Sequence, residues 1–269
     1  MTHTASSAAR EASAHPALET LARAGYAVNG FLHLVIAWIT LRIAIGWGGS
    51  ADQSGALEAV RDAPLGGVLL WVGVAGYAGL ALWRVLDAVV GYHPGASAEG
   101  QAEGAKDLGK GLVYTALAWT TWQFASGGST DSGESTADFT KTLMGMPWGQ
   151  ALVFVVGLAV VGVGGYHVWK GATQRFLEDL AGNAGGDLGK VVVLAGTVGY
   201  AAKGAALGVV GLLFCYAAWT TDPEEATGLD GALKALSGTA AGTVLLLVIA
   251  AGFVAYGLYS FARARYARL

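Results

Sequence analysis

The sequence has little charge and almost no cysteine. Only 13% of its 269 residues are charged, about half the share of roughly 25% found in soluble domains. By contrast, 54% of the residues are hydrophobic and the mean hydropathy is +0.50. The single cysteine, Cys215, lies in an apolar segment, which excludes an intrachain disulfide and favours a packing role. This composition is typical of a membrane protein.

Recognisable catalytic motifs are missing too. The chain contains no glycine-rich phosphate loop, no HExxH and no G-x-S-x-G. Carboxylate pairs at membrane depth, typical of proton-coupled transporters, are also missing, and no surface resembles a basic nucleic-acid-binding face. Residues 1–20 lack the apolar core of a cleavable signal. We therefore expect a protein that is not an enzyme, binds no nucleic acid and enters the membrane through its first long helix.

Long apolar segments are abundant instead. About 20 apolar residues are enough for a helix to cross a bilayer, and the 42 glycines would let such helices approach closely. The sequence predicts an all-α membrane protein with six transmembrane helices. They are predicted at 25–46, 65–86, 108–126, 148–169, 197–219 and 240–261.

The distribution of lysine and arginine predicts the orientation. Eleven basic residues lie in the two terminal tails and the two even-numbered loops, against three in the other loops. Cytoplasmic loops carry the excess of basic residues. The sequence therefore predicts cytoplasmic N- and C-termini and outward-facing acidic loops, one of which is the stretch 220–230.

An internal repeat organises these helices. Asn29, Lys110 and Lys203 fall in register in the first helix of three copies, and each is followed by a glycine. In the second helix, Pro64 aligns with Pro147. Between the two helices each copy carries a short amphipathic stretch, expected to form one or two helical turns on the outer membrane face.

The predicted organisation is thus three parallel repeats of a helix pair. A polar cytoplasmic tail (1–20) precedes repeat 1 (21–94), repeat 2 (95–180) and repeat 3 (181–269). Because each copy enters the membrane from the same side, the repeats should be related by a pseudo-threefold axis along the membrane normal. Whether they close as a ring does not follow from the repeats alone.

Four segments of the chain resemble a known family. The segments "GYAAKG", "TGLDGALKAL", "KGATQRFLEDL" and "YGLYSFARARYARL" are similar to the bacterial membrane proteins of domain-of-unknown-function family 1206. The resemblance covers nearly all of residues 21–269. It implies a bacterial plasma-membrane protein with six helices in three repeats. It implies no activity and no ligand.

The aligned polar positions give the candidate binding residues. Lys203 is predicted about one turn inside the cytoplasmic boundary, where its ammonium can reach the headgroups. Alternatively, Asn29, Lys110 and Lys203 converge near the pseudo-axis as a polar ring for an anion or an anionic lipid headgroup. His33, one turn beyond Asn29 on the same helical face, belongs to the same set of ligand candidates.

The membrane histidines His33 and His167 have no second ligand at metal-binding spacing. Structural or interfacial roles are therefore expected for both, and no metal and no cofactor are predicted. The best-supported function is a non-enzymatic scaffold or accessory protein that contacts lipid, a partner protein or further copies of itself. The alternative is a channel or transporter for a small solute. A cofactor-bearing enzyme or electron carrier is a third hypothesis.

Overall fold

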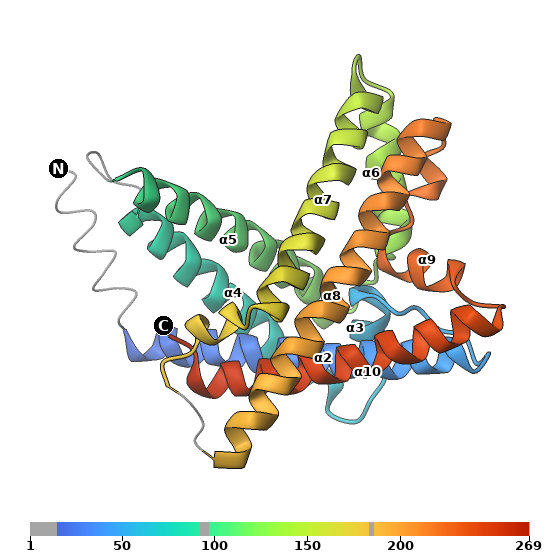
Figure 1. Cartoon of the computed structure of the whole chain (residues 1–269). Coiled ribbons are helices and arrows are strands. Elements are labelled where there is room, and N and C mark those ends of the chain that lie inside the picture. Colours follow the sequence, from blue (N-terminus) through green and yellow to red (C-terminus); the bar gives the residue numbers. More distant parts are fainter. Residues whose placement is uncertain (1–14, 92–96, 183–185, 269) are drawn as a thin grey trace. The chain divides into compact units, whose positions relative to one another are not determined.

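A computed structural model describes residues 15–91, 97–182 and 186–268 of the chain. In these ranges the regular elements are helices, which confirms the predicted all-α class (Figure 1). The long helices are α2 (Pro16–Ala44), α4 (Gly66–Gly91), α5 (Ala98–Ala125), α7 (Gly149–Ala172), α8 (Gly186–Thr220) and α10 (Ala240–Tyr266). The short ones are α3 (Gln53–Arg61), α6 (Ser132–Met144), α9 (Gly228–Ala235), η1 (Arg175–Asp179) and η2 (Pro223–Glu225).

Five of the long helices, α2, α4, α7, α8 and α10, are long and apolar enough to cross a membrane. The remaining predicted span, 108–126, does form a helix, α5, but this helix is less apolar than the other five. It begins with the polar stretch "AEGQAEGAKD", and Lys110, three threonines and Gln123 dilute the apolar remainder. Length therefore allows α5 to span, whereas its apolar content alone does not identify it as a span.

Several helices extend beyond their predicted limits. Helix α2 begins at Pro16, so the expected polar tail is helical from that residue, and residues 1–14 lie outside the described ranges. The polar segments 91–107 and 178–190, which join the apolar helices of successive repeats, are likewise partly helical, because α5 starts at Ala98 and α8 at Gly186. The hydroxyl of Ser97 caps α5 by accepting the N–H of Gly100.

The chain forms two compact units. Unit 1 consists of residues 1–29, 60–128 and 260–269, and unit 2 of residues 30–59 and 129–259. Unit 1 therefore contains the helix pair α4–α5 and the parts of α2 and α10 nearest the chain ends. Unit 2 contains α7, α8 and the remaining parts of α2 and α10.

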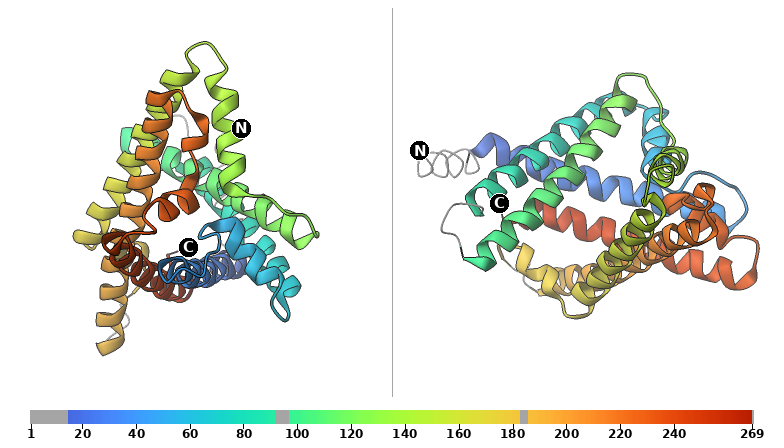
Figure 2. Two further views of the ribbon diagram at one scale, coloured as in Figure 1. Left: turned by 90° about the vertical axis from the view of Figure 1, so that its right-hand side faces the viewer. Right: turned by 90° about the horizontal axis from the view of Figure 1, so that it is seen from above.

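Close helix pairs join successive repeats. Helix α4 lies antiparallel to α5, and α7 lies antiparallel to α8 (Figures 1 and 2). Helix α10 of the third repeat lies antiparallel to α2 of the first: Arg23 bonds to the carbonyls of Ala264 and Arg265, and His33 contacts Phe253. In each pair the second helix of one copy therefore packs on the first helix of another.

The three pairs cross at the same register of the repeat. A Cβ on Gly204 of α8 would lie 2.5 Å from the carbonyl oxygen of Gly164 on α7, and one on Gly257 of α10 would lie 2.9 Å from that of Gly30 on α2. At Gly111 of α5 the corresponding neighbour is Ala81 of α4, at 3.6 Å. Gly30, Gly111 and Gly204 are the glycines that follow the aligned polar positions; the expected close backbone approach is confirmed at Gly30 and Gly204, whereas at Gly111 the backbone contact has an ordinary van der Waals distance.

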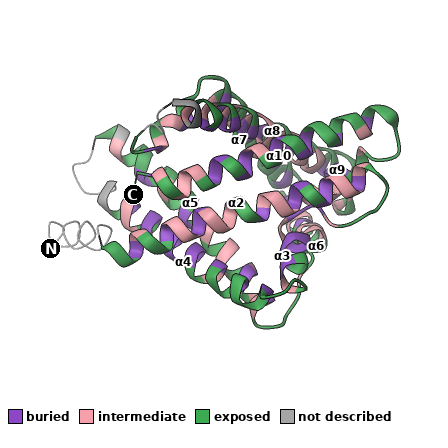
Figure 3. Ribbon diagram, turned by 90° about the horizontal axis from the view of Figure 1, so that it is seen from below, coloured by how far each residue is buried: buried purple, intermediate pink, exposed green. Residues whose placement is uncertain are grey.

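The short helices lie where the amphipathic stretches were predicted, and α3 and α9 bury apolar side chains within the protein (Figure 3), whereas Phe139, the largest apolar side chain of α6, is 63% exposed. Leu57, Thr140 and Leu233, one from each of α3, α6 and α9, are at most 1% exposed. Leu233 also shares a small cavity with Ala206 of α8, a residue about 21 Å of helix from Thr220. The expectation that these helices rest on the outer membrane face stays a prediction, because buried side chains in α3 and α9 do not place the helices relative to a membrane.

Candidate functional site

The four predicted binding residues fall into three local environments. In unit 1, the amide of Asn29 donates to the hydroxyl of Ser260 at 3.4 Å, and the ammonium of Lys110 donates to Asp107 at 2.8 Å. In unit 2, Lys203 and His33 meet on one side chain, Tyr256. The structure thus brings Lys203 and His33 together and gives Asn29 and Lys110 partners of their own.

Lys203 approaches both the hydroxyl and the ring face of Tyr256. Its Nζ lies 3.2 Å from the hydroxyl oxygen and 4.3 Å from the ring centroid. A cation over an aromatic face is stabilised by the quadrupole of the ring. The ring of His33 lies on the same tyrosine, with centroids 4.6 Å apart. The site therefore combines residues from α2, α8 and α10.

Tyr256 belongs to a larger aromatic cluster, which consists of Phe176, Tyr200, Tyr256 and Tyr259. Ring centroids within it lie 5.1 to 6.4 Å apart. Phe176 of η1 is fully buried, and its carbonyl accepts the hydroxyl of Tyr259 at 2.9 Å. The cluster therefore joins η1 to α8, which carries Lys203, and to α10.

The charge environment of Lys203 differs from that of Lys110, Lys170 and Lys234. Lys110, Lys170 and Lys234 each contact a carboxylate, at 2.8, 2.7 and 2.6 Å respectively. Among the described residues, the contacts of Lys203 are with the neutral Tyr256 and include no carboxylate within ion-pair distance. Lys203 is half-buried. A half-buried lysine beside a neutral partner can take an anion as its counter-charge.

A second polar cluster joins α4 and α5 in unit 1. The guanidinium of Arg84, with a side chain only 9% exposed, contacts Asp107 at 2.9 Å and the hydroxyl of Tyr26 at 3.1 Å. Asp87 lies 3.8 Å away. Asp107 is therefore shared by Arg84 and Lys110, and the charge of Lys110 is already compensated.

Both histidines have local partners. Nδ1 of His167 lies 2.8 Å from the carbonyl oxygen of Val163, and its ring stacks on Tyr200 with centroids 5.7 Å apart. His33 packs on Tyr256 and Phe253. Within the described ranges, no group of three or more His, Cys, Asp or Glu side chains could hold a metal ion. The absence of a cofactor stays a prediction.

Sequence reasoning missed three residues of these clusters: Tyr256, Phe176 and Asp107. The repeat alignment contains a signal for two of them. Tyr256 aligns with the apolar Leu80, and the carboxylate of Asp107 aligns with the neutral Tyr26, so at both positions one copy carries a more polar side chain than another. Phe176 lies in η1, between the aligned helices of the second and third repeats, and has no such signal.

Comparison with known proteins gives one family and one relative. The family model described as Domain of Unknown Function (DUF1206) matches residues 24–91, 106–174 and 198–267. The "Uncharacterized protein YxxB" of Bacillus subtilis (strain 168) is 26% identical over 253 residues, which cover 93% of this chain and 92% of that protein. No solved structure matches.

Proposed function

Because this chain belongs to the DUF1206 family, with its three repeats, we propose that it is a six-span, non-enzymatic scaffold or accessory protein of the bacterial plasma membrane that binds an anionic lipid headgroup at Lys203. The observation that carries the proposal is the half-buried ammonium of Lys203, whose partner is the neutral Tyr256. The lipid phosphate would supply the missing negative charge.

The proposed topology rests on the helix pairs. Five helices qualify as spans by length and composition, and α5 packs antiparallel along one of them, α4. From Lys110 to Ala125, α5 is about 24 Å long, close to the roughly 30 Å of a hydrocarbon core. The recurring crossing register supports a pseudo-threefold arrangement of six spans.

A depth near the inner boundary supports a lipid as the ligand. Lys203 precedes Trp219 by sixteen residues in α8, about 24 Å of helix. With the proposed orientation, in which Trp219 lies at the outer interface, Lys203 would lie near the cytoplasmic headgroups, where anionic lipids concentrate. A hydrogen bond to a charged group contributes about 1.5–3 kcal/mol, enough to select anionic over zwitterionic lipid.

The first test replaces Lys203 with methionine. Phosphatidylglycerol should raise the unfolding temperature of the wild-type protein in micelles more than phosphatidylcholine does. The difference should correspond to about 1.5–3 kcal/mol and should be largely lost in Lys203→Met. Thermal unfolding with each lipid, and with inorganic phosphate alone, measures the effect and separates a lipid from a free anion.

Two variants act as controls. Lys203→Arg keeps the charge and should keep the response to phosphatidylglycerol. Lys110→Met removes a lysine that already contacts Asp107, so it should leave that response near the wild-type value. Equal stabilisation of Lys203→Met and wild type would refute the proposal. A response to phosphate alone would favour the channel or transporter alternative.

The second test addresses the orientation. Single cysteines at the exposed positions Ser129 and Ser237, in a Cys215→Ser background, should react with a membrane-impermeant maleimide in intact cells. A cysteine at the exposed Ala102 should react only after the membrane is permeabilised. Labelling of Ala102→Cys in intact cells, with Ser129→Cys protected, would show the opposite orientation.

A further inference from the structure

The three short helices of the repeats meet in one polar junction within unit 2. The hydroxyls of Ser54 at the start of α3 and Ser132 at the start of α6 are hydrogen-bonded to each other. The backbone N–H of Ala51, just before α3, donates to the carboxylate of Asp230 on α9 at 2.9 Å. We call this meeting of α3, α6 and α9 the junction. Its contacts form where each short helix begins.

Three carboxylates and one ammonium belong to the junction. Asp52 is 5% exposed and caps α3 by accepting the N–H of Gly55 at 2.8 Å. Asp131 caps α6, and Asp230 pairs with Lys234 on α9 at 2.6 Å. If all four groups are ionised, the junction carries two net negative charges, which the positive ends of the short helices offset only in part.

Asp52 is the carboxylate of the junction whose ionised form is disfavoured. Burial raises the pKa of the Asp52 carboxyl above its ordinary value. The N–H of Gly55 and the ammonium of Lys234 oppose this rise in pKa, whereas the carboxylates of Asp230 and Asp131 add to it. These are the charged groups that face Asp52 from α9 and α6. A proton on Asp52 would remove both the burial penalty and the repulsion.

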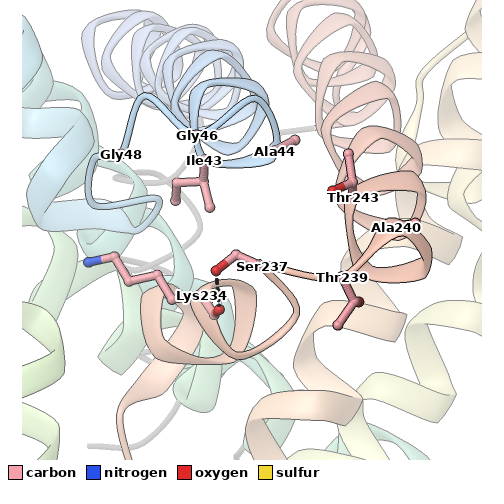
Figure 4. Close-up of a pocket in the computed structure, with 10 residues that line it drawn as sticks. Ile43, Ala44, Gly46, Gly48, Lys234, Ser237, Thr239, Ala240 and Thr243 are labelled. Carbon is pink, nitrogen blue, oxygen red and sulfur yellow. Dashed lines mark hydrogen bonds between the residues drawn. The ribbon is translucent and has the colours of Figure 1, made fainter.

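A pocket adjoins the junction at Lys234 (Figure 4). It has a volume of about 550 Å³ and is lined by Gly46 after α2, Lys234 of α9, Ser237 in the following turn and Thr243 of α10. Lys234 is thus both a wall of the pocket and the ion-pair partner of Asp230. Water in the pocket could exchange protons with the junction through these groups.

We propose that the junction of α3, α6 and α9 is a proton-binding site, in which Asp52 takes up the proton and the protonated form holds the three helices together more tightly than the ionised form. The carbonyl oxygen of a protonated Asp52 can still accept the N–H of Gly55, so the cap of α3 is kept. Ionisation restores the repulsion from Asp131 and Asp230 and loosens the junction. This site is independent of the lipid site at Lys203.

The direction of the pH effect follows from the raised pKa of Asp52. Its stabilising contribution is fully present below the ordinary aspartate pKa of about 3.9. That contribution is lost as the pH rises from there through the raised pKa of the folded protein, and it stays lost at higher pH. Each unit of the rise in pKa corresponds to about a tenfold change in the folding equilibrium constant between the two ends of this range.

The experiment compares the unfolding of the full-length wild-type protein with that of Asp52→Asn between pH 4 and 8 in micelles. Asparagine caps a helix as well as aspartate does and cannot titrate. The wild type should lose stability as the pH rises, and the difference between wild type and Asp52→Asn should change with pH by about tenfold per unit of the rise in pKa. Asp62→Asn, which alters an exposed carboxylate after α3, should follow the wild type.

Two further measurements secure the interpretation. Asp52→Ser keeps a capping oxygen and should reproduce Asp52→Asn, which guards against a folding defect in one variant. Hydrogen exchange, corrected for the intrinsic effect of pH, should show faster exchange in α3 and α9 at pH 7.5 than at pH 5 in the wild type, and no such change in either variant. A wild-type pH dependence retained by both variants would overturn the proposal.

Discussion

Replacing Asp107 with asparagine is expected to lower the free energy of unfolding by about 3 kcal/mol, the lower end of the range for breaking a buried ion pair. Asp107 is the carboxylate shared by Arg84 and Lys110. Its loss leaves the guanidinium of Arg84, only 9% exposed, with Asp87 at 3.8 Å as its remaining acidic contact. Chemical or thermal unfolding in micelles would measure the loss.

The pair Arg61–Asp62 provides a matched control for Asp107→Asn. It also joins an arginine to an aspartate, but the Asp62 side chain is 67% exposed. Asp62→Asn should therefore change stability by less than about 1 kcal/mol. The double variant Arg84→Met/Asp107→Leu should recover part of the loss, because neither charge is then left buried alone. If Asp107→Asn is as mild as Asp62→Asn, the Arg84 cluster does not stabilise the α4–α5 pair.

Replacing Gly204 with alanine should destabilise the protein by about 1–3 kcal/mol, as overpacking typically does. The added Cβ would lie 2.5 Å from the carbonyl oxygen of Gly164 and 2.8 Å from the backbone nitrogen of Val168. Both are backbone atoms of α7, which cannot move aside without separating the helices. The loss would be measured as a lower unfolding temperature.

Gly208, one turn further along α8, gives a control with the opposite sign. A Cβ there meets nothing within 4 Å. Gly208→Ala should thus stabilise the helix by up to about 1 kcal/mol, the difference in helix propensity between the two residues. If the two alanine variants behave alike, helix propensity rather than the crossing with α7 determines the effect at both positions. The close α7–α8 contact at Gly204 would then not contribute to stability.

Most of the fold that could be predicted followed from the pattern of apolar and polar residues along the chain. Five of the predicted spans correspond to helices long and apolar enough to cross a membrane, because the length and composition of such a helix are properties of consecutive residues. The polar start of α5 shows where this reasoning weakens. That helix is stabilised by its neighbour through the pair Arg84–Asp107, and such a partner cannot be read from the apolar content of α5 itself.

The candidate site was predicted in part. Lys203 and His33 were identified because the repeat alignment exposes polar residues in apolar helices. Tyr256 was not, because an isolated tyrosine in a membrane helix is as typical of packing as of binding. Lys110 shows the reverse case: it is aligned with Lys203, yet its contact with Asp107 gives it an environment of its own.

The sequence by itself determined the helical class, the three copies and the glycines at each crossing, because repeats and apolar length are properties of neighbouring residues. The tertiary structure alone decided which helices pair, that α10 packs on α2, and that α3 and α9 bury apolar side chains. It also decided which lysines have a carboxylate partner. These outcomes depend on contacts such as that of Asn29 with Ser260, 231 residues apart. Contacts of that kind form only when packing brings distant helices together, so no local pattern encodes them.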